Sequence, residues 1–268
     1  MAEKRARVGG PMTALRHGVM TALMSGAILA VQGMPAGAAD CPVDHGRLVQ
    51  ALKASVKPSG GPKNGGFENH QWAAVVARDG TVCAVAFSGD KADDQWPGSR
   101  AVAMEKASTA NAFSVKKMAL STANLFAQAQ PGQSLYGILQ ASPPSAEALS
   151  GDASQFGTPS DPMVGKRIGG IVVFGGGLAL YDQNGVVGGL GVSGDSSCAD
   201  HNVAWRVRSA LGLDKVPAGV NPSRKDAIVH DLGPDGKSAS GFGHVKCAGD
   251  EADVANELAA GVGGQSLK

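Results

Sequence analysis

The sequence is poor in aromatic residues and in charge. Aromatic residues make up 4% of the 268 residues and charged residues 18%, and the formal net charge is +1. So weak a charge excludes the basic surface that a nucleic-acid-binding protein needs. With few aromatics, a core has to be built from alanine, valine, leucine and isoleucine. Hydrophobic residues still reach 43%, which excludes global disorder.

Glycine is abundant instead, with 39 residues, about twice the usual share of ~7%. The glycines follow no three-residue period, so the chain is not collagen-like. Beyond residue 39 no apolar run approaches the ~18 residues of a membrane span.

Residues 1–39 have the three parts of a secretory signal peptide. An apolar run over residues 19–31 is followed by small residues over 36–39 and preceded by basic ones, which are Lys4, Arg5, Arg7 and Arg16. A retained membrane anchor is the weaker alternative, because the run is short for a bilayer. We therefore expect an exported protein, periplasmic or extracellular.

Four cysteines lie beyond the leader: Cys41, Cys83, Cys198 and Cys247. An even number in an exported chain favours two disulfide bonds, and three pairings are open. None of the cysteines forms a C-x-x-C pair, which argues against a structural zinc site.

The hydrophobic patterns predict an α+β protein with a five-stranded antiparallel sheet covered by helices. Asp79-Gly80 and Asn184-Gly185 are strong hairpin signals. The expected strands span residues 72–78, 81–87, 168–174, 178–181 and 186–192. The expected helices span residues 40–56, with Asp40 as the cap, 99–113, 118–130, 196–211 and 250–260.

We expect one domain over residues 40–215, with a long excursion over residues 131–167. A polar tail follows over residues 216–268, and Cys247 is placed to tether it by a disulfide bond.

The segment Gly189–Gly194 matches the dinucleotide fingerprint G-x-G-x-x-G, but its surroundings oppose that function. The preceding strand leaves a hairpin, and Asp195 would repel a pyrophosphate. The glycines indicate instead that a helix, a ligand or a second subunit approaches the strand closely. The group Asp195, Cys198, Asp200 and His201 fits helix capping better than a metal site.

Four blocks in order resemble the GlcG/HbpS-like haem-binding family, which also occurs as the carboxy-terminal domain of some cobalamin adenosyltransferases. The resemblance covers roughly residues 45–213. The blocks are residues 75–80 (VVARDG), 105–110 (EKASTA), 173–177 (VFGGG) and 188–194 (GGLGVSG).

The resemblance implies a profilin-like fold, assembly into dimers or larger oligomers, and haem binding linked to iron handling, sometimes beside a membrane sensor or a transporter. It assigns the haem iron to Thr109, or alternatively to His45 on the first helix. Arg100, Lys106, Lys116 and Lys117 would be available for the haem propionates. Gly176 and Gly191 would line a thin apolar slot beneath an alanine-faced helix.

Three functions follow as alternatives. The first is an exported haem-binding protein for carriage, sequestration or sensing. The second is an enzyme acting on haem or another small ligand. The third is a non-catalytic module that binds a partner and no cofactor.

Overall fold

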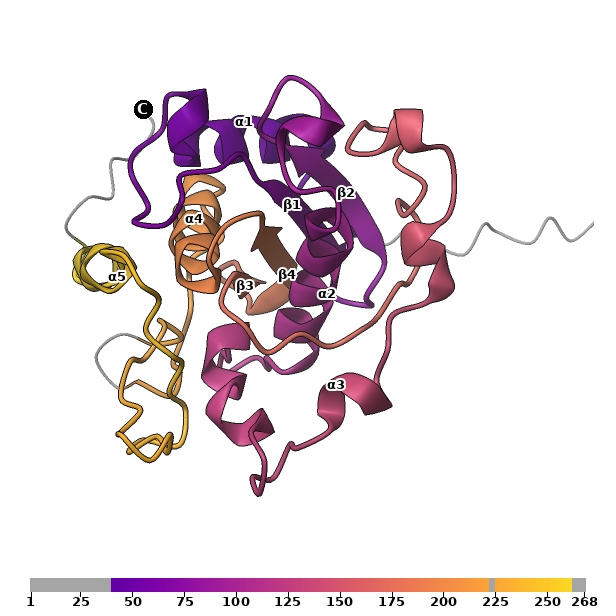
Figure 1. Ribbon diagram of the computed structural model, residues 1–268. Helices are drawn as coiled ribbons and strands as arrows, with labels where there is room; N and C mark the ends of the chain where they lie inside the picture. The colour runs from indigo at the N-terminus through magenta and orange to yellow at the C-terminus, as the bar shows by residue number, and fades with distance from the viewer. Residues whose placement is uncertain (1–39, 222–224, 262–268) are drawn as a thin grey trace, which may run out of the picture. The chain divides into compact units, whose positions relative to one another are not determined.

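The computed structural model describes residues 40–221 and 225–261, built on a four-stranded antiparallel sheet (Figure 1). The strands lie in the order β2-β1-β4-β3. Their bounds are β1 Trp72–Ala77, β2 Val82–Phe87, β3 Gly177–Tyr181 and β4 Val186–Ser193. Both predicted hairpins form, and Gly80 and Gly185 take the left-handed backbone angles that their turns require, with φ of 86° and 133°. The α+β class is confirmed, with four strands rather than five.

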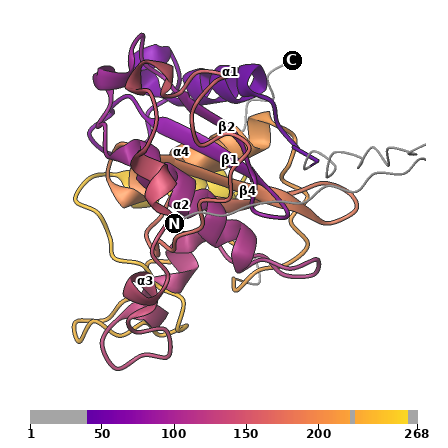
Figure 2. The ribbon, with the colours of Figure 1, turned by 90° about the vertical axis from the view of Figure 1, so that its right-hand side faces the viewer.

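Helices cover both faces of this sheet. The α-helices are α1 His45–Ser55, α2 Ser99–Ala112, α3 Ile138–Ala141, α4 Ser197–Ala210 and α5 Glu251–Ala259. Short 3₁₀ turns span Lys57–Ser59, Ala92–Asp94, Thr122–Leu125, Ala127–Ala129, Ala146–Leu149 and Ala153–Gln155. In both views α3 lies at the opposite end of the sheet from α1 (Figures 1 and 2).

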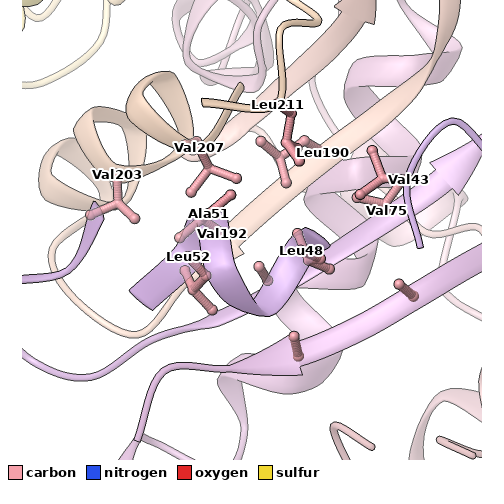
Figure 3. Close-up of a cluster of buried hydrophobic side chains, with 14 of the residues drawn as sticks. Val43, Leu48, Ala51, Leu52, Val75, Leu190, Val192, Val203, Val207 and Leu211 are labelled. Carbon is pink, nitrogen blue, oxygen red and sulfur yellow. The ribbon is translucent and has the colours of Figure 1, made fainter. Parts of the chain in front are cut away.

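The alternation of side chains along each strand divides the core into two layers. In β1, Ala73 and Val75 pack with α1 and α4, whereas Ala74 and Val76 pack with α2. Figure 3 shows the first layer, where Leu48 of α1 and Val207 of α4 lie over Leu190 of β4. One side of the sheet therefore carries two helices and the other carries α2.

The predicted strand over residues 168–174 is wrong. Gly169 and Gly170 have φ of 71° and 84°, left-handed angles that an extended strand cannot contain. The backbone N–H of Val172 donates to the hydroxyl of Thr109 at 3.0 Å instead of to a neighbouring strand. The segment therefore runs across α2 outside the sheet.

The predicted helix over residues 118–130 is also wrong, and two 3₁₀ turns stand in its place. The side chain of Asn124 accepts hydrogen bonds from both the backbone N–H and the hydroxyl of Ser121. Its amide also donates to the carbonyl of Ala227, 3.1 Å away. Side-chain bonds of this kind compete with a regular helix.

The first helix starts later than predicted, because Asp44 rather than Asp40 caps it. The Asp44 carboxylate accepts from the backbone N–H of Arg47 at 2.9 Å. The other helices lie close to prediction: Gly98 precedes α2, Ser196 caps α4, and α5 lies within residues 250–260.

All four cysteines are paired, as Cys41–Cys83 and Cys198–Cys247. The expectation of two disulfide bonds is confirmed, and the second bond ties the tail to α4. A buried ion pair joins the same two parts, since Arg208 donates to both carboxylate oxygens of Asp226 at 2.6 and 3.0 Å. The tail is thus fixed to α4 by a covalent bond and an ion pair, in addition to hydrogen bonds such as that from the N–H of Ile228 to His201 at 3.2 Å.

In the described part of the chain, no helix combines the length and the apolar character needed to cross a bilayer. The predicted leader, residues 1–39, lies outside the described residues.

Candidate functional site

The structure closes the slot that was predicted between β4 and α2. A Cβ atom built on Gly191 would lie 1.9 Å from the carbonyl oxygen of Ala103 and 2.5 Å from the backbone nitrogen of Ala107. On Gly189 it would lie 2.2 Å from the carbonyl oxygen of Ala107. The helix backbone therefore rests directly on the strand backbone, and no space remains there for a ligand. The predicted ligand-binding role of Gly191 has no basis in this geometry.

Gly176 also serves packing. Its φ is 113°, and a Cβ there would lie 2.4 Å from the carbonyl oxygen of Val192 and 2.9 Å from Nζ of Lys106. Only glycine fits a left-handed position this crowded. The small residues of strand and helix meet one another rather than framing a gap.

Thr109 is fully buried on α2, and its hydroxyl is already engaged. It donates to the carbonyl of Glu105 at 2.7 Å and accepts from the N–H of Val172 at 3.0 Å. Glu105 is half-buried nearby, and loss of solvent raises the pKa of its carboxyl group. In this structure Thr109 holds the 168–174 segment against α2.

His45, the alternative iron ligand, is the first residue of α1, with Nε2 2.8 Å from the carbonyl oxygen of Gly157. Helices α1 and α2 pack on opposite faces of the sheet. The structure therefore does not bring His45 and Thr109 together.

Two cations expected to bind propionates are buried in ion pairs. The guanidinium of Arg100 donates to both carboxylate oxygens of Asp161 at 2.8 and 2.5 Å. Nζ of Lys106 lies 2.7 Å from the carboxylate of Asp200, and only 2% of each side chain is exposed. Neither cation is free to meet an anionic ligand. Lys116 and Lys117, by contrast, are exposed.

A groove of about 480 Å³ lies where the tail meets the turn at Phe126. It is lined by Phe126, Gln130, His230, Leu232, Gly233, Pro234, Gly236, His244, Val245 and Lys246. The tail is held here by the N–H of Ala127, which donates to the carbonyl of Gly243 at 3.2 Å. In Figure 2 this part of the tail lies at the same end of the sheet as α3. We call this feature the tail groove.

Aromatic rings continue the apolar wall of the tail groove. The ring centroids of Phe126 and His244 are 4.9 Å apart, and those of Phe126 and Phe174 are 6.0 Å apart. Phe174 and Val245 are exposed large apolar side chains, so apolar surface is accessible at the tail groove. The exposed Lys246 adds a positive charge to the lining.

Both ring nitrogens of His244 are used. Nε2 accepts from the N–H of Gly175 at 3.3 Å, which leaves Nδ1 to donate to the carbonyl of Val245 at 2.8 Å. Burial lowers the pKa of His244 to about 4, because the charged ring would lose its hydration. His244 is therefore a neutral structural residue.

His230 is different, because one of its nitrogens is unused. Nδ1 lies 3.3 Å from the carbonyl oxygen of His244, so this nitrogen carries the proton and donates. Nε2 is buried and has no hydrogen-bond partner within residues 40–221 and 225–261. Burial also lowers the pKa of His230, which favours the neutral ring, in which Nε2 carries a lone pair.

Sequence reasoning missed the tail groove. His230 and His244 lie in a segment without regular periodicity, and no motif in the sequence singles out either of them. One signal was available: Cys247 predicted a bond from the tail to the core, and His244 is three residues away.

Comparison with known proteins gives one family and several structures. The model of the family described as "Haem degrading protein HbpS-like" matches residues 67–208. No curated protein sequence gives a significant match.

Three similar solved structures are a PduOC:heme complex, protein ORFY from Klebsiella pneumoniae, and HbpS. The first has 22% identity and a TM-score of 0.44, and the match covers 64% of this chain and 94% of that one. ORFY has 20% identity and a TM-score of 0.41, with 63% and 90% covered. HbpS has 18% identity and a TM-score of 0.38, again with 63% and 90% covered. Since the family model spans more than half of the sequence, the protein belongs to the HbpS-like family of haem degrading proteins.

Proposed function

We propose that the protein binds haem outside the cytoplasm, as a carrier, a sequestering protein or an accessory of a sensor. The observation that carries this proposal is the family match over residues 67–208. The tail groove supports it, since its lining joins apolar walls to a cation and to a histidine nitrogen without a partner. Haem needs these three features: apolar area for the macrocycle, positive charge for a propionate and a ligand for iron.

The sequence-derived ligands fit less well. The Thr109 hydroxyl already donates to the carbonyl of Glu105 and accepts from the N–H of Val172, and Nε2 of His45 lies beside the carbonyl of Gly157. Either residue would have to give up those contacts to reach iron. Binding through a single protein ligand would be exchangeable, which suits carriage or sensing better than electron transfer.

Export is part of the proposal. Two disulfide bonds suit an oxidising compartment, and the residue pattern of 1–39 suits a cleaved leader. We propose further that residues 40–215 form the haem-binding domain with residues 216–268 as its tethered tail. Homo-oligomers and a membrane sensor or transporter as partner complete the proposal.

Titration of the purified protein with haemin tests the function. We expect the Soret band to shift and the change to saturate at about one haem per chain, which is the stoichiometry of binding in the tail groove. Albumin-free buffer and a size-exclusion step separate bound from aggregated haem. An unchanged free-haemin spectrum at every ratio would reject haem binding and favour the partner-binding alternative.

Haem breakdown is the second candidate, favoured by the family's description as haem degrading. We expect the haem complex, given hydrogen peroxide, to lose its Soret band faster than a control haem protein at equal concentration. Release of iron to a ferrous chelator is the second readout. Bleaching at the rate of the control would reject haem breakdown as an activity and leave haem binding as the proposed function.

A further inference from the structure

We propose that haem occupies the tail groove and that Nε2 of His230 is its iron ligand. This inference rests on the proposed haem-binding function. It places the ligand beyond residue 208, where the family match ends. The site would then be shared between Phe126 of the matched region and a tail that the family model does not include.

The hydrogen bonding of His230 is that of a metal ligand. Histidines that bind metals usually donate their other ring N–H to a carbonyl or carboxylate, which fixes the tautomer and the orientation of the ring. His230 does this through Nδ1, which donates to the carbonyl oxygen of His244 at 3.3 Å. The lone pair on Nε2 has no partner in the described part of the chain. A buried acceptor without a partner is costly, and a bound ligand would remove that cost.

The other histidines of the described residues are less suited. Nε2 of His45 lies beside Gly157, and Nδ1 of His70 lies 3.0 Å from the hydroxyl of Ser88. His201 has an unpartnered Nδ1, but its ring is fully buried and does not line the tail groove. His244 uses both nitrogens. Of the two histidines that line the tail groove, His230 is therefore the one with an unpaired ring nitrogen.

The surroundings of His230 suit an apolar disc with acidic substituents. Leu232 and Val245 of the tail line the groove together with Phe126, which lies outside the tail. Lys246 is exposed and lines the same groove, within reach of a propionate. In this structure less than 1 Å² of Nε2 is exposed, so ligation requires the groove to open over this nitrogen while Nδ1 keeps its bond to the carbonyl of His244.

The variant His230→Asn tests the assignment directly. The asparagine amide stands near the position of Nδ1 and can still donate to His244, whereas Nε2 is lost. We expect the haem complex of the wild-type protein to show the electron paramagnetic resonance and Soret signature of an imidazole ligand. In His230→Asn that signature should disappear and haemin affinity should fall at least about tenfold. His70→Asn is the matched control, because His70 does not line the tail groove, and its spectrum and affinity should equal those of the wild type.

A third variant separates loss of the ligand from loss of the fold. Adding imidazole to His230→Ala should restore the wild-type spectrum, because the free base can occupy the vacated position. A wild-type haem spectrum in His230→Asn would overturn this ligand while leaving the proposed function intact. Failure of imidazole to restore the spectrum would overturn it too. Absence of haem binding by the wild type would instead reject the proposed function itself.

Discussion

Replacing Gly191 by alanine is expected to destabilise the protein by more than about 3 kcal/mol. The added methyl group would lie 1.9 Å from the carbonyl oxygen of Ala103 and 2.5 Å from the backbone nitrogen of Ala107. Both are backbone atoms of α2, so no side-chain rotation can relieve the clash. The helix would have to lift from β4, which pairs with β1 and β3 in the middle of the sheet. Urea denaturation followed by circular dichroism measures the loss.

Gly46→Ala is the matched control, since it makes the same chemical change in open space. Gly46 is exposed in the first turn of α1, and its Cβ would lie 3.4 Å from the Asp44 carboxylate, an ordinary contact. Alanine favours a helix over glycine by up to about 1 kcal/mol. The control should therefore be as stable as the wild type or slightly more so. A Gly191→Ala protein within 1 kcal/mol of the wild type would show that α2 does not rest on the strand as described.

Removal of one partner of the Lys106–Asp200 ion pair is expected to cost about 3–5 kcal/mol at pH 8. In Lys106→Met the Asp200 carboxylate would stay buried without its cation, which now lies 2.7 Å away. Burial already outweighs the attraction of Lys106 and raises the pKa of Asp200 to about 6. The variant should therefore recover much of its stability at pH 5, where the carboxyl group can take up a proton.

The direction of this pH dependence follows from linkage. A carboxyl group whose pKa is higher in the folded than in the unfolded state loses stability as the pH rises from about 4 through its folded pKa. Without Lys106 the folded pKa rises further, so the loss extends to higher pH. Chemical denaturation at pH 5 and pH 8 measures the free energy of unfolding below and above the folded pKa of Asp200.

The double variant Lys106→Met/Asp200→Asn is the control that separates the effect of an unpaired charge from the effect of altered packing. Asparagine keeps an oxygen to accept from the N–H of Asp195, which now donates to Asp200 at 2.9 Å. The double variant should be more stable than Lys106→Met alone at pH 8, because no uncompensated charge remains. Equal stability of the single variant at both pH values would contradict a buried, unpaired carboxylate.

Local sequence signals predicted the parts of the fold that depend on local chemistry. Asp79-Gly80 and Asn184-Gly185 predicted both hairpins, and the pair Ser196-Ser197 predicted the start of α4, which Ser196 caps. Local signals failed where a contact with a distant segment determines the backbone conformation. Residues 168–174 are apolar enough for a strand, but two left-handed glycines and the bond to Thr109 direct them across α2.

The candidate site was less predictable than the fold. Small residues in β4 and α2 suggested a gap, but small residues equally permit contact, and close packing gains dispersion energy that an empty slot would lose. The tail groove arises only when the tail docks on the turn at Phe126, and no periodicity in residues 225–250 indicates that docking. A single sequence shows which residues are small or basic, but it does not show which distant segment covers them in the folded protein.

The Cys198–Cys247 bond makes assembly of the tail groove depend on where the chain folds. Thiols stay reduced in the cytosol and become oxidised outside it. Protein made in a reducing cytoplasm would hold His230 and His244 in place by noncovalent contacts alone, among them the Arg208–Asp226 pair and the bond from the N–H of Gly175 to His244. If haem occupies the tail groove as proposed, a preparation from such a host would contain less of the haem-loaded form than one from an oxidising compartment.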